Sequence, residues 1–229
     1  MKIGHEYQIV EIDKETIPNY SFKVIISGKS GVGKTSIIRY EMDKVFSNNL
    51  NSPTIFDHFF KNYKIDDKII RLQIWDTGGE DTYEIVLKNL YKLALCILVV
   101  FSLDDESSFL YLSKIIKNIN ELNEIEEPLI ILVGNKSDNI SERKIEKEDI
   151  EKFCDDYNVE NYFEVSAKSG DNINDMFKSV VTQLYVNYIV PNYSDNHTNL
   201  ANNTNKKVLS NNNGGFDNDK CNICSCLIY

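Results

Sequence analysis

The sequence lacks an excess of basic residues and lacks any long apolar segment. Its 229 residues include 25 lysines and arginines against 35 aspartates and glutamates, a formal net charge of −10. So acidic a chain gains no electrostatic attraction to nucleic acid, which argues against general binding of RNA or DNA. The longest apolar run, 94–101, is far too short to span a bilayer, and no signal peptide is apparent at the start. We therefore expect a cytosolic body.

Disulfide bonds are not expected either. Of the five cysteines, Cys96 and Cys154 stand alone, and the other three crowd the last nine positions. A disulfide framework does not suit a protein in a reducing compartment.

Short apolar or alternating segments, typical of strands, are separated by segments with helical spacing. The strand-like segments are 22–27, 59–64, 69–75, 94–101, 129–133 and 162–165. The clearest helix follows Asn172 and places apolar residues from Ile173 to Leu184 on one face. This alternation predicts an α/β fold with a doubly wound, mostly parallel sheet, one antiparallel edge strand and helices on both faces.

Three regions follow from the composition. Residues 1–19 are a polar N-terminal extension without a clear period, and 20–188 form the α/β domain. Residues 189–229 are rich in asparagine and end in a cysteine cluster. A tail with so few large apolar residues cannot offset its ordering entropy, so we expect it to be flexible.

A glycine-rich segment follows the first predicted strand. Residues 28–35, Gly-Lys-Ser-Gly-Val-Gly-Lys-Thr, fit the G-x-x-x-x-G-K-[ST] pattern of a phosphate-binding loop. Glycines let backbone N–H groups converge on phosphate oxygens, and the helix that follows adds positive potential. The residues expected around the phosphates are Ser30, Gly31, Val32, Gly33, Lys34, Thr35 and Ser36. A glycine turn that matches by chance is the alternative.

Magnesium ligands are expected close to this loop. The Thr35 hydroxyl would bind Mg²⁺, and Asp76, at the end of a strand, would hold the ion through water. Lys34 would reach the β- and γ-phosphates, and the Gly79 N–H would approach the γ-phosphate. Without the phosphate-binding loop upstream, residues 76–79 would be equally consistent with an ordinary Asp-Gly turn.

Two further segments predict a guanine site. Asn135, Lys136 and Asp138 follow one strand, and 166–168, Ser166, Ala167 and Lys168, follow another. The Asp138 carboxylate can accept hydrogen bonds from guanine N1–H and N2–H₂, which adenine does not offer at that edge. Either segment alone is common in ordinary loops. Because they occur in this order and each follows a strand, the two segments together indicate a guanine site.

Together these motifs resemble the Ras superfamily of small GTPases, and the segment around Trp75 most resembles Rab proteins. The resemblance implies that Thr54 ligates Mg²⁺ in the GTP-bound form and that Phe46 packs edge-on against guanine. It also implies that Lys34, Thr54 and the residue at position 80 take part in hydrolysis. Effectors, exchange factors and GTPase-activating proteins would bind the switch regions, around 46–60 and 79–91.

The sequence departs from that family at several positions. Residues 53–57 are closer to Ras than to Rab, and the Rab surface triad maps to Phe59, Trp75 and Leu90, which loses its third aromatic member. Glu80 replaces the glutamine that orients the attacking water. A carboxylate donates no hydrogen bond at neutral pH, so we expect slow hydrolysis. A role of Glu80 as a base toward water is the alternative.

The sequence therefore predicts a GTP/GDP switch in membrane trafficking. A GTP-binding scaffold with little hydrolysis, a Ras-like signalling GTPase and an unrelated P-loop kinase are the alternatives. Cys224 and Cys226 resemble prenylation sites, although tyrosine is an unusual last residue of such a box. A metal site that includes Cys221 is the alternative. Lipidation predicts attachment to the cytosolic face of a membrane, with a soluble pool.

Overall fold

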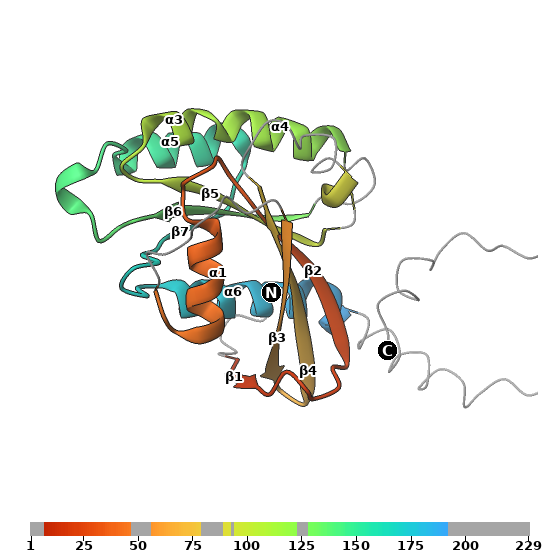
Figure 1. The fold of residues 1–229 in the computed structure, drawn as a ribbon. Helices are drawn as coiled ribbons and strands as arrows, with labels where there is room; N and C mark the ends of the chain where they lie inside the picture. The colour runs from red at the N-terminus through yellow and green to blue at the C-terminus, as the bar shows by residue number, and fades with distance from the viewer. Residues whose placement is uncertain (1–6, 47–55, 79–88, 93, 123–127, 192–229) are drawn as a thin grey trace, which may run out of the picture.

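The computed structural model describes residues 7–46, 56–78, 89–92, 94–122 and 128–191. Within them, seven strands form one sheet in the order β1-β3-β4-β2-β5-β6-β7 (Figure 1). The strands are β1 (Ile9–Ile12), β2 (Tyr20–Ser27), β3 (Phe56–Ile65), β4 (Lys68–Thr77), β5 (Cys96–Ser102), β6 (Leu129–Asn135) and β7 (Asn161–Glu164). The helices are α1 (Lys34–Asp43), α3 (Glu106–Leu110), α4 (Leu112–Leu122), α5 (Lys147–Tyr157) and α6 (Ile173–Tyr188), with a 3₁₀ turn at Ile140–Glu142.

The strand directions confirm the predicted fold class. β2 pairs in parallel with β4 and β5, and β6 pairs in parallel with β5 and β7. β3 is antiparallel to β4, and β1 is antiparallel to β3. The sheet thus has one strand more than the sequence pattern indicated, because part of the N-terminal extension extends its antiparallel edge.

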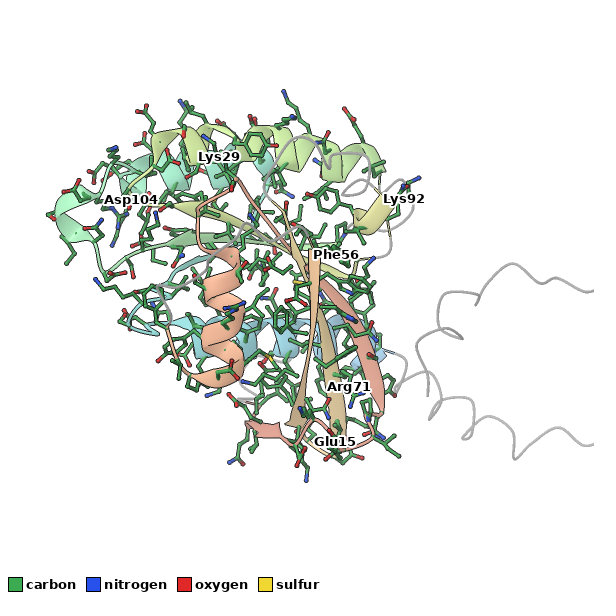
Figure 2. All side chains as sticks on the ribbon, in the orientation of Figure 1. Glu15, Lys29, Phe56, Arg71, Lys92 and Asp104 are labelled. Atoms are coloured by element: carbon green, nitrogen blue, oxygen red, sulfur yellow. The ribbon has the colours of Figure 1, made fainter. Side chains whose placement is uncertain are left out.

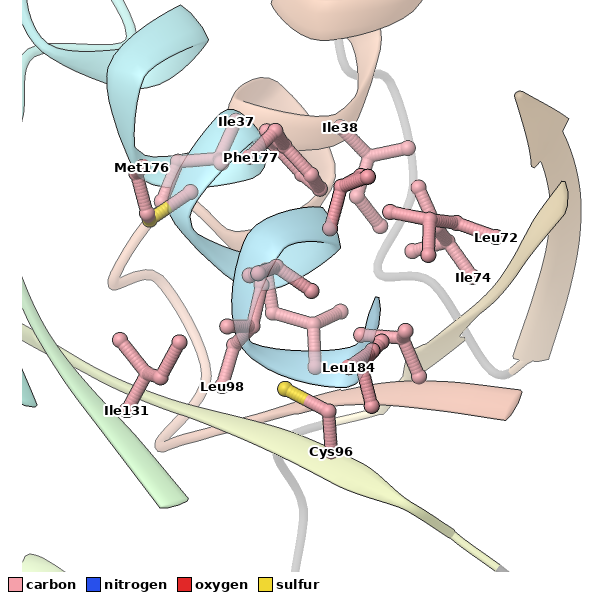
Figure 3. Close-up of a cluster of buried hydrophobic side chains, with 14 of the residues drawn as sticks. Ile37, Ile38, Leu72, Ile74, Cys96, Leu98, Ile131, Met176, Phe177 and Leu184 are labelled. Carbon is pink, nitrogen blue, oxygen red and sulfur yellow. The ribbon is translucent and has the colours of Figure 1, made fainter. Parts of the chain in front are cut away.

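Alternating side chains of the central strands fill two apolar layers, one on each face of the sheet. In β5, Cys96 and Leu98 point toward α1 and α6, whereas Ile97 and Val99 point toward α4 and α5. Figure 3 shows the layer between the sheet and helices α1 and α6, where Cys96 and Leu98 lie beneath Leu184 and other residues of α6. Continuous apolar strands of this kind are expected when helices cover both faces.

A buried charge cluster attaches the edge strand β1 to the domain. The carboxylate of Glu41, on α1, is fully buried and lies 2.7 Å from Lys61 Nζ on β3. It also accepts a hydrogen bond from the Tyr63 hydroxyl at 2.7 Å. Glu11 of β1 completes the cluster, since it lies 3.0 Å from Lys61 and 3.2 Å from Lys44. The cluster joins β1, α1 and β3, three elements that are distant in the sequence.

The chain between β1 and β2 is held against the β3–β4 hairpin by side chains. Asn62 Nδ2 donates to the backbone oxygens of Asp13 and Thr16, at 3.0 and 2.9 Å. Arg71 Nη2 donates to the backbone oxygens of Lys14 and Thr16, at 2.7 and 3.1 Å. These bonds satisfy backbone groups of a segment that has no regular structure of its own. Part of the N-terminal extension is therefore an ordered component of the domain.

The charge cluster predicts unequal effects of two lysine substitutions. Lys61→Met leaves the buried Glu41 carboxylate without its closest cation, so we expect a loss of roughly 3 to 5 kcal/mol in the free energy of unfolding. Lys44→Met removes an ammonium group that is 44% exposed and bonds the same carboxylate. Removal of this ammonium group should lower the free energy of unfolding by at most about 1 kcal/mol. Urea unfolding of both variants measures the difference, and equal losses would contradict this account of the cluster.

Candidate functional site

The predicted site residues gather where the parallel strands end. The loops after β2, β5, β6 and β7 and the last residues of β4 all meet at one edge of the sheet. β2 lies at the centre of the sheet, between β4 and β5. The next strands along the chain, β3 and β4, lie on one side of it, and β5, β6 and β7 lie on the other. Ligands of open α/β sheets bind at such a point, beyond the carboxyl ends of the strands.

The loop between β2 and α1 requires its glycines. Gly33 has φ +96°, and a Cβ built on it would lie 2.2 Å from Asn135 Nδ2. At Gly28, with φ +152°, a Cβ would lie 2.2 Å from the backbone oxygen of Val100. The loop therefore packs directly against the ends of β5 and β6. It leads into α1, whose first backbone N–H groups have no acceptor within the helix.

Lys34 is buried beneath this loop. Its Nζ donates to the backbone oxygens of Gly28 at 2.8 Å and Lys29 at 3.0 Å. Burial lowers the pKa of Lys34 to about 8, although the nearby Asp76 carboxylate opposes the shift. The ammonium group thus lies under the turn, close to the start of α1, where an anion would be stabilised.

Thr35 and Asp76 form an oxygen pair that suits Mg²⁺. The Thr35 hydroxyl donates to Asp76 Oδ2 at 2.5 Å, and Asp76 is fully buried. Asp76 Oδ1 accepts no hydrogen bond from any residue that the structure describes. Burial raises the pKa of this carboxyl, and the Thr35 hydrogen bond only partly offsets the rise. A buried carboxylate oxygen without a partner, beside a hydroxyl, fits a hard cation with oxygen ligands.

The Asn135 side chain joins three of the predicted motifs. Its Nδ2 donates to the backbone oxygen of Val32 in the glycine-rich loop, at 2.8 Å. Its Oδ1 accepts from the backbone N–H of Ala167, at 3.0 Å. All of these groups are buried, so each bond is costly to lose. Asn135 therefore fixes the distance between the glycine-rich loop and the two loops that follow β6 and β7.

The segment between β5 and α3 contacts the loop after β6, and the first turn of α3 contacts the glycine-rich loop. The sequence did not indicate either contact. Asp104 lies 3.2 Å from Lys136 Nζ and accepts from the Ser102 hydroxyl at 2.5 Å. Burial favours a higher pKa for Asp104, but these hydrogen bonds and the Lys136 charge outweigh it and lower the pKa. Lys29, in the glycine-rich loop, donates to the Ser107 hydroxyl at 2.7 Å. The position of Asp104 just after a predicted strand was the signal available in the sequence.

Asp138 lies at the opening of the site with an oriented carboxylate. Its Oδ1 accepts from the Ser166 hydroxyl at 2.6 Å, and its Oδ2 lies 3.7 Å from Lys168 Nζ. The Ser166 side chain is buried, whereas the Asp138 side chain remains 24% exposed. A ligand can therefore reach a carboxylate whose direction is already set.

Five of the predicted site residues lie outside the described residues: Thr54, Gly79, Glu80, Cys224 and Cys226. Phe46 is half-buried just after α1, and its expected contact with a base stays a prediction. The described residues that the fold brings together are the glycine-rich loop, Lys34, Thr35, Asp76, Asn135, Lys136, Asp138 and the 166–168 segment.

The family model described as Ras family matches residues 23–186. This chain is a small GTPase of the Ras family. The match includes every described residue of the site and excludes the whole of the N-terminal extension, 1–19, and of the tail, 189–229.

Rab proteins are among the relatives of this GTPase. The Ras-related protein Rab-13 of Bos taurus is 34% identical over 167 residues, which cover 72% of this chain and 81% of the relative. The Ras-related protein Rab-8B of Homo sapiens is 33% identical over 170 residues, with the same shares. Rab-9A of Rattus norvegicus is 31% identical over 166 residues, 71% of this chain and 82% of the relative. The predicted resemblance to Rab proteins is confirmed.

The predicted surface triad of the GTPase was wrong in its first member. Phe59 is paired with Ile74 and packs against the apolar core beside α1 and α6. His58 is paired with Trp75 instead, and the two rings stack at 4.0 Å. Neighbouring side chains of a strand point to opposite faces, so an error of one residue exchanges core for surface.

The opposite face of the hairpin carries an aromatic row, which we define as Phe56, His58, Phe60 and Trp75. The ring of Phe56 lies 5.1 Å from Trp75, and that of Phe60 lies 4.2 Å from His58. Phe56 and Phe60 are 43% and 40% exposed, whereas Trp75 is half-buried. Lys23 lies 5.3 Å above the Trp75 ring and donates to the backbone oxygen of Leu90 at 2.9 Å. The row is thereby connected to the residues that follow 79–88.

The central position of Asn135 predicts a large effect from a small change. Asn135→Ala leaves the backbone oxygen of Val32 and the N–H of Ala167 without their partners. Each unsatisfied buried group costs about 1 to 3 kcal/mol, so we expect a loss of roughly 2 to 6 kcal/mol in unfolding free energy. Asn139→Ala, which removes only a long 3.4 Å bond to Asp104, is the matched control. Chemical denaturation compares the two, and a loss no greater than that of the control would refute the bridging role.

Proposed function

We propose that the protein binds GTP and GDP with Mg²⁺ and works as a switch that recruits effector proteins in its GTP-bound form, in membrane trafficking. The observation that carries the proposal is the position of Asp138. Its carboxylate is oriented by Ser166, and Asn135 ties the loop that bears it to the glycine-rich loop. A base bound at Asp138 would thus have its phosphates at the start of α1.

The phosphate end of the site is assigned from Lys34, Thr35 and Asp76. Lys34 and the backbone N–H groups of 30–36 bind the β- and γ-phosphates. Thr35, Asp76 and, in the GTP-bound form, Thr54 hold Mg²⁺, which neutralises charge on the phosphate oxygens when bound. Gly79 contributes a backbone N–H to the γ-phosphate. Loss of that phosphate releases Thr54 and Gly79, and the switch segments then change conformation.

The base end of the site selects guanine. Asp138 accepts hydrogen bonds from N1–H and N2–H₂, and the stem of Lys136, held by Asp104, covers one face of the base. The backbone N–H of Ala167 or Lys168 is close enough in sequence to bond the guanine O6, while Phe46 packs against the ring edge. Adenine would leave the carboxylate unpaired, a mismatch that costs on the order of 10⁴ in affinity in sites built around such a bond.

Asp138→Asn tests the base assignment. The amide can donate to the second carbonyl of xanthine but no longer accepts both guanine hydrogen bonds. We expect GDP affinity to fall by a factor on the order of 10² to 10⁴ while XDP affinity rises. Asp171→Asn, the same change on an exposed neighbouring loop, should alter neither constant. Fluorescence titration with labelled nucleotides gives the dissociation constants for GDP and for XDP. An unchanged GDP affinity of Asp138→Asn would show that Asp138 does not belong to the site.

Hydrolysis of GTP is proposed to be slow because of Glu80. The residue at this position must orient water and stabilise charge on the transferred phosphoryl group. A carboxylate repels that charge and cannot donate a hydrogen bond to it. A scaffold that binds GTP with little hydrolysis is the extreme form of this proposal.

Single-turnover hydrolysis of GTP by Glu80→Gln tests the effect. We expect the variant to be faster by roughly tenfold or more, since about 1.4 kcal/mol in the barrier suffices. Glu84→Gln removes a carboxylate from the same segment and should leave the rate unchanged. Equal rates for wild type and Glu80→Gln would make position 80 irrelevant, and a slower variant would indicate that Glu80 acts as a base.

Membrane attachment is proposed through the tail cysteines. Within the described residues, no helix is both long and apolar enough to cross a membrane. Prenylation of Cys224 and Cys226 would supply two lipids, and stable anchoring requires two signals. We infer a peripheral protein on the cytosolic face, with a soluble pool, whose exchange factor and GTPase-activating protein bind the switch segments.

A further inference from the structure

The N-terminal extension builds a cleft against the outer face of the β3–β4 hairpin. The cleft has a volume of about 530 Å³. Its walls include Lys14, Ile17 and Pro18 from the extension and Phe60, Arg71 and Gln73 from the hairpin. Figure 2 shows Glu15 and Arg71 at one end of the hairpin and Phe56 at the other. The family match begins at residue 23, so the first wall lies outside the matched domain.

The cleft combines an apolar wall with positive charge. Ile17 and Phe60 are 78% and 40% exposed, which is high for large apolar side chains. Arg71 lies 5.8 Å above the Phe60 ring. Its Nε and Nη2 atoms are bound to Asn62 and to the extension, whereas its Nη1 bonds no described residue. Lys14 and Glu15 line the rim. Such a cleft suits an apolar or aromatic side chain flanked by carboxylates.

The tail of this chain contains a segment with that chemistry. Residues 216–219 are Phe-Asp-Asn-Asp, and the 24 residues from 192 to 215 that precede them include few large apolar side chains. An aromatic ring followed by two carboxylates matches an apolar wall beside Lys14 and Arg71. In a chain with a net charge of −10, a cleft with more cations than anions is the complement of such a segment.

The tail begins near the start of β2, which also borders the cleft, but on the other face of the sheet. The ring of Tyr188, the last residue of α6, lies 6.0 Å from the ring of Phe22 on β2. Tyr20, two residues before Phe22, lines the cleft. If the composition of residues 192–215 is taken to predict a flexible linker, these 24 residues would have a root-mean-square span of roughly 25 to 30 Å. The tail segment is then present at an effective concentration on the order of millimolar, so that even a weak site would be occupied.

We propose that residues 216–219 of the tail dock in this cleft of the same chain, with Phe216 against Ile17 and Phe60 and the two carboxylates facing Lys14 and Arg71. The docked segment covers Phe60, which is also a member of the aromatic row. It therefore competes with any partner protein that binds the row and holds the neighbouring tail cysteines near the domain. The inference goes beyond the proposed function and does not depend on which nucleotide binds.

Photo-crosslinking of the full-length chain tests the docking. A p-benzoylphenylalanine in place of Phe216 should form crosslinks within one chain to 14–21 or to 60–73, mapped by mass spectrometry. Asp217→Asn with Asp219→Asn should lower the yield roughly threefold to tenfold, because the segment loses both of the charges that face Lys14 and Arg71. Asp195→Asn, a charge change elsewhere in the tail, is the matched control and should leave the yield unchanged. Ile17→Ser, at an exposed position, should also lower it.

Three outcomes would overturn the proposal. They are crosslinks scattered over the domain, a yield that is insensitive to the two aspartates, and crosslinks that join an isotope-labelled copy to an unlabelled one. The last result would indicate a second copy of the chain as the occupant. Nucleotide binding measured on the same samples separates failure of docking from failure of the proposed function, since all these substitutions lie outside the site.

Discussion

The buried amide of Asn135 is the interaction on which the rest of the site depends. It links the backbone oxygen of Val32 to the N–H of Ala167 and so joins the loops after β2, β6 and β7. Gly33 leaves the room that this amide needs, because a Cβ there would overlap Asn135 Nδ2. The glycine-rich loop and the loops after β6 and β7, which we propose bind the phosphates and the base, are thus held at one separation by groups of the chain itself. Binding then requires little rearrangement of these loops, which preserves affinity.

Local patterns in the sequence were sufficient for the motifs and for most of the strands. The glycine-rich loop, Asp76 and the 135–138 segment each follow an apolar run, and parallel strands bring their carboxyl ends to one edge. The contacts between the motifs were not predictable in this way. Asp104 holds Lys136, but only the tertiary structure shows that the β5–α3 segment reaches the base loop.

Two features were missed for physical reasons. β1 spans only Ile9–Ile12, too short for a periodic signal, and it is stabilised by residues as distant as Lys61 and Asn62. His58 and Phe59 differ by one position, yet one faces outward and the other the core. The pairing register of the hairpin decides between them, and register is a property of two strands together.

The central claim is that a guanine nucleotide occupies this site, and nucleotide competition tests it most directly. The protein would be loaded with fluorescent GDP and Mg²⁺ and then challenged with unlabelled GTP, GDP or ATP. We expect displacement by GTP and GDP and none by ATP, even at an excess on the order of 1,000-fold, because adenine leaves the Asp138 carboxylate unpaired. Displacement by ATP at concentrations similar to GTP would contradict the central claim.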